Sequence, residues 1–193
     1  RLGPGSRVFI PGGAGGVVTF AIQIAKWLGA EVTTTASTRG RVLVESLGAD
    51  HVIDYTTERF EDRVRDMDGV FDLLGGETLS RSFVVVKPGG KVVSIAGMPE
   101  PQTARKDLDR GGLLPLLFWF ASFRTRREAR AHKVGYRYLF MRPSGSELAE
   151  LGGLIASGKL QPVVDRVFPF SEIKDAFAYL ETGRAKGKVV VGM

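Results

Sequence analysis

The stretch VFIPGGAGGVV, residues 8–18, places a short apolar run before a cluster of glycines and the start of a helical pattern. Residues 8–10 are typical of a buried strand, and apolar positions within 17–28 recur on one helical face up to Gly29, which is suited to end a helix. A turn from strand into helix presents backbone N–H groups and the positive end of a helix dipole, and both favour phosphate. Glycine leaves room for a pyrophosphate, so the stretch predicts a phosphate-binding turn, with an ordinary tight turn as the alternative.

Gly13 and Gly15 supply the first two glycines of the G-x-G-x-x-G pattern, and Val18 occupies the third position. Glycine or alanine at that position allows the closest packing of helix on strand. A valine there is expected to widen the gap between helix and strand or to crowd a cofactor. We therefore expect Val18→Gly to tighten cofactor binding.

Strand and helix patterns alternate along most of the chain, which is typical of a parallel sheet covered on both faces. The predicted strands lie at residues 8–10, 31–36, 51–53, 69–74, 91–96 and 136–141. The predicted helices lie at residues 17–28, 39–47, 60–65, 78–86, 113–130 and 143–157, with a loop at 99–110. The sequence thus predicts an α/β fold, a Rossmann-type three-layer sandwich with a six-stranded, mainly parallel sheet and helices on both faces.

The end of the second predicted strand indicates which cofactor the turn binds. NAD-binding domains usually place Asp or Glu there to hold the ribose hydroxyls. Here the strand runs into Ser37, Thr38 and Arg39, and no acid follows until Glu45. Two hydroxyls and a guanidinium suit a 2′-phosphate, and Arg41 is a second candidate. These residues predict NADP(H); the alternative is a helix N-cap followed by surface charges.

Composition argues against several sites and partners. The chain has no Cys, and His51 and His132 are isolated, so no metal site is expected. The formal charge of +6 is concentrated in residues 124–142, where seven Lys or Arg accompany one Glu. That region has no DNA-binding motif or aromatic platform, so we expect no nucleic-acid partner. The absence of cysteine fits a cytoplasmic protein.

The apolar run at residues 113–123 is too short to cross a bilayer, which takes roughly 20 residues, and it contains Pro115. No membrane partner is therefore expected. The run is interpreted first as an ordinary core helix. The alternatives are a face for a further domain, a wall of the substrate cleft and a dimer interface.

A series of short motifs in a fixed order resembles the quinone-oxidoreductase branch of the medium-chain dehydrogenases/reductases, which is zinc-independent. The resemblance spans essentially the whole chain. The motifs are GGAGGV (12–17), QIAK (23–26), LGA (28–30), STR (37–39), LGADHVIDY (47–55), DLLGG (72–76), KPGG (87–90), GKL (158–160) and GRAKGK (183–188).

The resemblance implies a role for each of several residues around NADP(H). The pyrophosphate would lie at Gly13, Ala14, Gly15, Gly16 and Val17. The 2′-phosphate would be surrounded by Ser37, Thr38, Arg39 and Tyr55. Leu74 and Gly75 would lie along the cofactor, and Ile95 and Gly97 would lie nearer the nicotinamide. Phe140, on the sixth predicted strand, would flank the nicotinamide. As alternatives, Tyr55 is a plain surface residue and Phe140 a plain core residue. No catalytic residue can be named.

The same resemblance implies the activity and the domain organisation. The parent enzyme would transfer hydride between NADPH and a quinone, enone or related carbonyl compound. Residues 1–162 would form the dinucleotide-binding domain, and 163–193 a segment returning to a GroES-like catalytic domain absent from this chain. The strands at 163–168 and 188–191 would then lack their usual partners, and the chain alone would bind cofactor but turn over poorly.

Three further expectations concern assembly and rival functions. A homodimer is possible through an edge strand, with the sixth strand as the candidate. The rival functions are the cofactor domain of a zinc-dependent alcohol dehydrogenase and a non-catalytic dinucleotide-sensing module. A Cys- and His-bearing domain immediately upstream would favour the first rival, and no such domain at all would favour the second.

Overall fold

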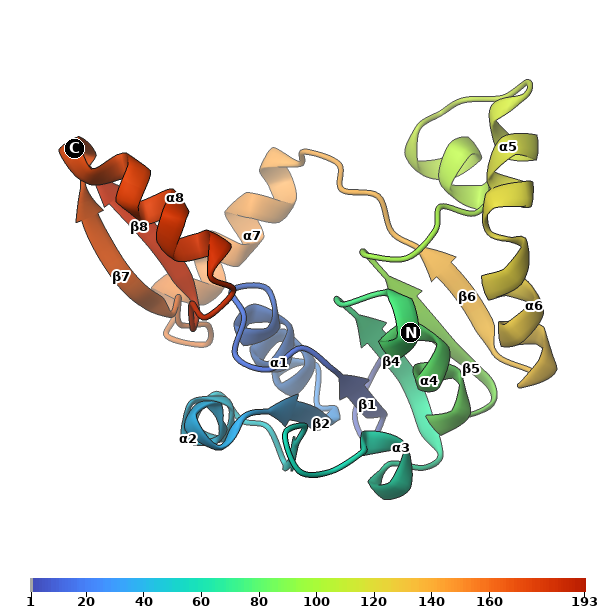
Figure 1. Ribbon diagram of the computed structural model, residues 1–193, viewed down its shortest axis with the longest axis horizontal. Helices are drawn as coiled ribbons and strands as arrows, with labels where there is room; N and C mark the ends of the chain where they lie inside the picture. Colours follow the sequence, from blue (N-terminus) through green and yellow to red (C-terminus); the bar gives the residue numbers. More distant parts are fainter. Residues whose placement is uncertain (1) are drawn as a thin grey trace.

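The computed structural model describes residues 2–193; Arg1, where the expected domain 1–162 begins, lies outside the described residues. A six-stranded sheet in the order β3-β2-β1-β4-β5-β6 forms its centre (Figure 1). The strands are β1 (Arg7–Ile10), β2 (Glu31–Ala36), β3 (His51–Asp54), β4 (Met67–Asp72), β5 (Val86–Ser94) and β6 (Gly135–Tyr138). All neighbouring pairs are parallel, so the predicted α/β Rossmann-type fold is confirmed.

The alternation of side chains along the strands divides the core into two layers. On β1, Phe9 belongs to one buried cluster, whereas Val8 and Ile10 belong to the other. The layer of Val8 and Ile10 lies under α1 (Val18–Trp27) and α2 (Thr38–Ser46). The opposite layer lies under α3 (Phe60–Arg63), α4 (Gly76–Val85) and α6 (Phe123–Ala131). Each large apolar side chain buried there stabilises the fold by about 1.5–3 kcal/mol.

The strand order creates a crevice at the carboxyl ends of β1 and β4. These strands are neighbours, yet the chain visits β2 and β3 between them. Their following turns lead to helices on opposite faces of the sheet. In open α/β sheets, ligands bind at such a switch point.

Residues 113–130 form two helices, not the single helix predicted. α5 (Leu114–Ala121) and α6 are separated by Ser122, which is fully buried. The Ser122 hydroxyl donates to the carbonyl oxygen of Phe118 at 2.6 Å and accepts from Arg126 Nε at 3.0 Å. A serine that bonds back to the preceding turn competes with the helical hydrogen bonds and bends the helix.

The predicted loop at 99–110 contains a π-helical turn, Thr103–Asp107, which β6 holds in place. Arg137 donates to Glu100 Oε1 at 2.7 Å and to Asp107 Oδ1 at 2.5 Å. Both carboxylates are almost completely buried and require such partners. Asp107 Oδ2 also accepts from the backbone N–H of Phe140 at 3.3 Å. The chain therefore leaves the sheet after Tyr138, and Phe140 lies beyond β6 and not on it as predicted.

The C-terminal part forms a smaller unit on the side of α1, where Gln161 and Gln23 exchange hydrogen bonds (Figure 1). α7 (Gly145–Ala156) begins after Ser144, whose Oγ caps the helix by accepting from the backbone N–H of Glu147 at 3.3 Å. β7 (Val164–Pro169) and β8 (Lys188–Gly192) then form a parallel pair joined through α8 (Ile173–Glu181). Each of these strands thus pairs with the other, and the expectation that they lack their usual partners in a catalytic domain stays a prediction. The boundary at residue 162 stays a prediction.

Two observations concern assembly. β6 forms one edge of the six-stranded sheet, as pairing with a second copy would require. The edge-strand homodimer itself stays a prediction. Within residues 2–193, no helix combines the length and the apolar character needed to cross a membrane.

Candidate functional site

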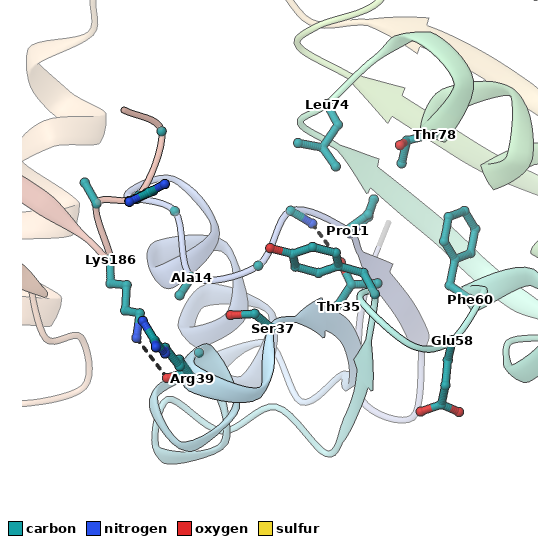
Figure 2. Close-up of a pocket in the computed structure, with 18 of the residues that line it drawn as sticks. Pro11, Ala14, Thr35, Ser37, Arg39, Glu58, Phe60, Leu74, Thr78 and Lys186 are labelled. Carbon is teal, nitrogen blue, oxygen red and sulfur yellow. Dashed lines mark hydrogen bonds between the residues drawn. The ribbon is translucent and has the colours of Figure 1, made fainter. Parts of the chain in front are cut away.

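A cavity of about 670 Å³ opens at the switch point between β1 and β4 (Figure 2). It lies within the size range of cofactor sites. Its walls come from the turn after β1, the start of α2, the segment after β3, the start of α4 and residues 183–186. Among the residues predicted from sequence, seven line it: Gly13, Ala14, Gly15, Ser37, Arg39, Tyr55 and Leu74.

The glycine turn after β1 forms the floor of this cavity. Gly12 and Gly13 have φ angles of +133° and +65°, which side-chain-bearing residues rarely adopt. The N–H of Gly12 donates to Thr35 Oγ1 at 3.2 Å, which ties the turn to β2. α1 then begins without a side-chain cap and without an acid in its first turn. Its positive end thus offers the arrangement that favours a phosphate group.

Val18 does not line the cavity. It is 3% exposed, and its Cγ2 lies 3.1 Å from the position that a Cβ on Gly12 would take. Because Gly12 has no side chain, the Val18 side chain fits between the helix and the turn, and no glycine is needed at position 18. The structure gives no support to the expectation that this valine crowds a cofactor.

The cavity has a basic end where β2 meets α2. Ser37 occupies the N-cap position of α2 but makes no side-chain cap bond. Arg39 lies beside it, and Lys186 Nζ donates to the carbonyl oxygen of Arg39 at 2.9 Å (Figure 2). Arg184 also lines the cavity. Arg41, the second candidate, instead pairs with Glu45 at 3.4 Å on the next turn of α2.

Thr38 has a structural partner and does not line the cavity. Its hydroxyl donates to Asp54 Oδ2 at 2.6 Å, and Thr56 donates to Asp54 Oδ1 through both its hydroxyl and its N–H. These hydrogen bonds, with that of Thr38 first, lower the pKa of Asp54 to about 2. Asp54 is itself absent from the cavity wall. The carboxylate at this end of the sheet is thus engaged by threonines and does not occupy the place of a ribose-binding acid.

The opposite wall is formed by residues near β4. Leu74 follows β4, and Thr78 and Arg81 lie on α4 beside Phe60. The Arg81 guanidinium lies 4.6 Å from the centre of the Phe60 ring, and its Nε donates to Glu61 Oε1 at 2.7 Å. That hydrogen bond is the main reason why the pKa of Glu61 falls to about 2. Arg81 is therefore held in place before any ligand arrives.

Asp72 fixes the turn that follows β4. It is completely buried, and it accepts hydrogen bonds from the N–H groups of Leu74 and Gly75 and from Ser94 Oγ at 2.5 Å. Gly75 has a φ of +67°, and a Cβ there would collide with the carbonyl oxygen of Ala96. This glycine is required by the packing of the protein itself.

Seven predicted residues lie outside the cavity wall: Gly16, Val17, Thr38, Gly75, Ile95, Gly97 and Phe140. A Cβ on Gly97 would collide with the Tyr136 hydroxyl, so this glycine too has a packing role. Ile95 and Phe140 are 36% and 42% exposed, so Phe140 is not the core residue considered as its alternative. Their proposed places near a nicotinamide stay predictions.

The segment at residues 183–187 was not predicted as part of the site. Gly187 pairs with Gly15 in a parallel bridge, and a Cβ on Gly16 would lie 2.9 Å from the carbonyl oxygen of Gly187. Gly16 therefore allows this segment to approach. The only sequence signal was the motif GRAKGK, which contributed to the resemblance but carried no assigned position in space.

The described residues offer no metal centre. No group of three or more His, Cys, Asp or Glu within residues 2–193 is close enough to hold a metal ion. His51 pairs with Glu31 at 3.0 Å on the exposed edge of the sheet.

Comparison with known proteins identifies the family. Residues 47–191 match the family described as zinc-binding dehydrogenase. The chain belongs to this family. Within it, the chain is a quinone oxidoreductase-like cofactor domain of the medium-chain dehydrogenase/reductase superfamily, as the motifs predicted.

Relatives of this dehydrogenase domain are about twice its length. It is 38% identical to NAD(P)H oxidoreductase RTN4IP1, mitochondrial, of Danio rerio, over 97% of this chain and 49% of the relative. It is also 38% identical to NADPH-dependent alkenal/one oxidoreductase, chloroplastic, of Arabidopsis thaliana, over 97% of this chain and 40% of the relative. The quinone oxidoreductase of Coxiella burnetii superposes with a TM-score of 0.82 at 31% identity, covering all of this chain and 54% of that one.

Proposed function

We propose that this chain binds NADP(H) in the cavity between β1 and β4. We further propose that it is the cofactor domain of an oxidoreductase that transfers hydride between NADPH and a quinone, enone or related carbonyl compound. The observation that carries the proposal is the cavity lining, which includes Ser37, Arg39, Arg184 and Lys186 and no carboxylate from β2. Relatives whose names include NADPH-dependent alkenal/one oxidoreductase and quinone oxidoreductase support the reaction class.

The arrangement divides the dinucleotide between two kinds of contact. The glycine turn and the positive end of α1 suit the pyrophosphate, which needs close backbone approach and no side chains. The basic end suits a 2′-phosphate, which carries up to two charges that an NADH ribose lacks. The nicotinamide supplies the hydride chemistry when it is bound, and this chain supplies position.

A titration of the purified chain with NADPH and NADH, followed by fluorescence, tests the cofactor. NADPH is expected to bind more tightly. Arg39→Ala should weaken NADPH binding by about tenfold or more, because a hydrogen bond to a charged group contributes about 1.5–3 kcal/mol. NADH binding should change little.

Arg41→Ala is the matched control, since Arg41 lies on the same helix but pairs with Glu45 outside the cavity. It should leave both affinities unchanged. Equal weakening of NADPH and NADH by Arg39→Ala would show that Arg39 acts only structurally. NADH binding as tight as NADPH would contradict the choice of cofactor.

The compartment does not follow from this site. The two relatives from Danio rerio and Arabidopsis thaliana carry mitochondrial and chloroplastic names. A cytoplasmic location stays a prediction from cysteine content alone.

A further inference from the structure

The apolar helix α5 lies on the outside of the molecule, at the opposite end from β7 and β8 (Figure 1). All eight of its residues are apolar, and only Pro115 is buried. The exposed fractions are 61% for Leu117, 63% for Phe120 and 40% for Trp119. Leu113 and Phe123, at its two ends, are 75% and 45% exposed. The interpretation of this run as a core helix is therefore wrong.

Basic residues precede and follow α5 along the chain. Exposed side chains of Arg105, Lys106 and Arg110 precede α5, and those of Arg124, Arg127, Arg130 and Lys133 follow it. Of the three acids in residues 105–133, Asp107 is bound to Arg137 and Glu128 accepts from Ser80. Asp109 is the one exposed carboxylate in that range. Residues 105–133 thus carry +5 of the chain's formal charge of +6.

The geometry points to an anionic lipid surface as the partner of α5 and its basic flanks. We propose, in place of the expectation of no membrane partner, that α5 lies in the interface of a membrane with Leu117, Phe120 and Trp119 among the acyl chains. The exposed arginines and lysines of 105–133 would then face the lipid phosphates. Binding at the membrane interface grows with the apolar area that is buried and with the attraction of Lys and Arg to anionic lipids.

Charge decides between this partner and a second copy of the chain. A two-fold dimer centred on α5 would bring two identical basic surfaces together. The region offers almost no exposed carboxylate to neutralise them. A bilayer with anionic headgroups satisfies both features at once, because it takes up the apolar side chains and attracts the cations.

Contacts around Trp119 order the aromatic end of α5. Arg126 holds the aromatic end of α5, since its Nη2 donates to the carbonyl oxygen of Trp119 at 2.8 Å and its guanidinium lies 5.3 Å from the Trp119 ring. Phe120 packs edge-on against Trp119 at 4.9 Å. The apolar side chains are therefore presented together.

Flotation of the 193-residue chain with lipid vesicles tests the proposal. The chain should float with vesicles of phosphatidylcholine and phosphatidylserine, and much less with phosphatidylcholine alone. Leu117→Ser with Phe120→Ser should abolish flotation. Arg124→Gln with Arg127→Gln should weaken it by about fivefold per charge removed, and added salt should weaken it further.

Matched control variants remove two apolar side chains, or two positive charges, from surfaces outside α5 and its basic flanks. Val42→Ser with Leu148→Ser removes two apolar side chains that are 74% and 70% exposed on other helices. Lys159→Gln with Lys174→Gln removes two exposed charges far from α5 in the sequence. Both control pairs should float like the parent chain. Thermal unfolding of every variant verifies that it is folded.

A second measurement reports insertion directly. Trp27→Phe leaves Trp119 as the single tryptophan of the chain. Its emission should shift to the blue with anionic vesicles and be quenched by brominated acyl chains. Flotation that is equal on both lipids, absent on both, or retained by the α5 variant would overturn the proposal. So would self-association of the chain that Phe120→Ser abolishes, which would assign the surface to a second copy. The proposal does not depend on the cofactor, so an unsuccessful NADPH titration would leave it standing.

Discussion

The turns after β1 and β4 both contain glycines, yet they need them for different reasons. After β1, a Cβ on Gly13 or Gly15 would meet its nearest neighbour at 3.7 Å, which is ordinary contact. After β4, a Cβ on Gly75 would collide with the backbone of Ala96. The glycines after β1 leave space open towards the cavity. The glycine after β4 allows the turn to approach the backbone that follows β5. A glycine in a sequence therefore does not distinguish a ligand site from a packing constraint.

The largest effect should come from Gly75→Ala. The positive φ angle and the collision with Ala96 together should lower the free energy of unfolding by about 3 kcal/mol or more. Urea unfolding measures the loss. Gly76→Ala is the control, because Gly76 has a φ of +53° but no atom within 4 Å of its Cβ position. A similar loss in both variants would mean that backbone strain, and not the close approach, decides this turn.

Val18→Gly should come next. Removing a buried valine from a helix and introducing glycine should lower the free energy of unfolding by about 2–3 kcal/mol. Because Val18 does not line the cavity, the affinity of the folded chain for NADPH should not change. Val17→Gly is the control, since Val17 is 47% exposed at the N-cap of the same helix. Tighter NADPH binding in Val18→Gly would restore the view that this valine crowds the cofactor.

Glu61 should make the β4 side of the cavity sensitive to acid. Its pKa is about 2 in the folded chain against an ordinary 4.5, chiefly because of Arg81. A lowered pKa stabilises the fold fully above pH 4.5, and this contribution is lost as the pH falls through about 2. Glu61→Gln should flatten the pH dependence of urea unfolding in that window by about 1–2 kcal/mol, reduced for solvent screening. An unchanged profile would show that Arg81 is not held by this ion pair.

Gly15→Ala should have the smallest effect on stability, within about 0.5 kcal/mol, because its φ is not positive and its surroundings are open. It should nevertheless weaken NADPH binding by about tenfold, since a methyl group would enter the space proposed for the pyrophosphate. Gly152→Ala, on α7 with no atom near its Cβ position, should change neither binding nor folding adversely. Unaltered NADPH affinity in Gly15→Ala would place the pyrophosphate elsewhere.

The sequence predicted what local pattern determines. β2 begins and ends where its β-branched run predicted, and α1 begins within one residue of the predicted start. The glycine turn, Ser37 and Arg39 were placed in one cavity because carboxyl ends of parallel strands meet at one edge of a sheet.

The sequence did not predict what depends on contacts between distant residues. The π-helical turn is held by Arg137, which binds Glu100 and Asp107, both at least 30 positions earlier in the chain. No periodicity in the sequence reveals that pairing. The hydrogen bond between Thr38 and Asp54 depends on the register of β2 and β3, which the sequence does not reveal. Thr38 was therefore assigned to a phosphate. The exposure of α5 escaped prediction because an apolar run looks the same in a core and on a surface.

The bridge between Gly15 and Gly187 has a consequence for biosynthesis. The sheet and its two core layers are built from residues that leave the ribosome before residues 183–187, and domains generally begin to fold in that order. The wall at 183–187 is synthesised more than 140 residues after the glycine turn that it covers. A nascent chain can therefore form its core while the dinucleotide cavity still lacks one side. Cofactor binding in the completed cavity would then follow the synthesis of residues 183–187.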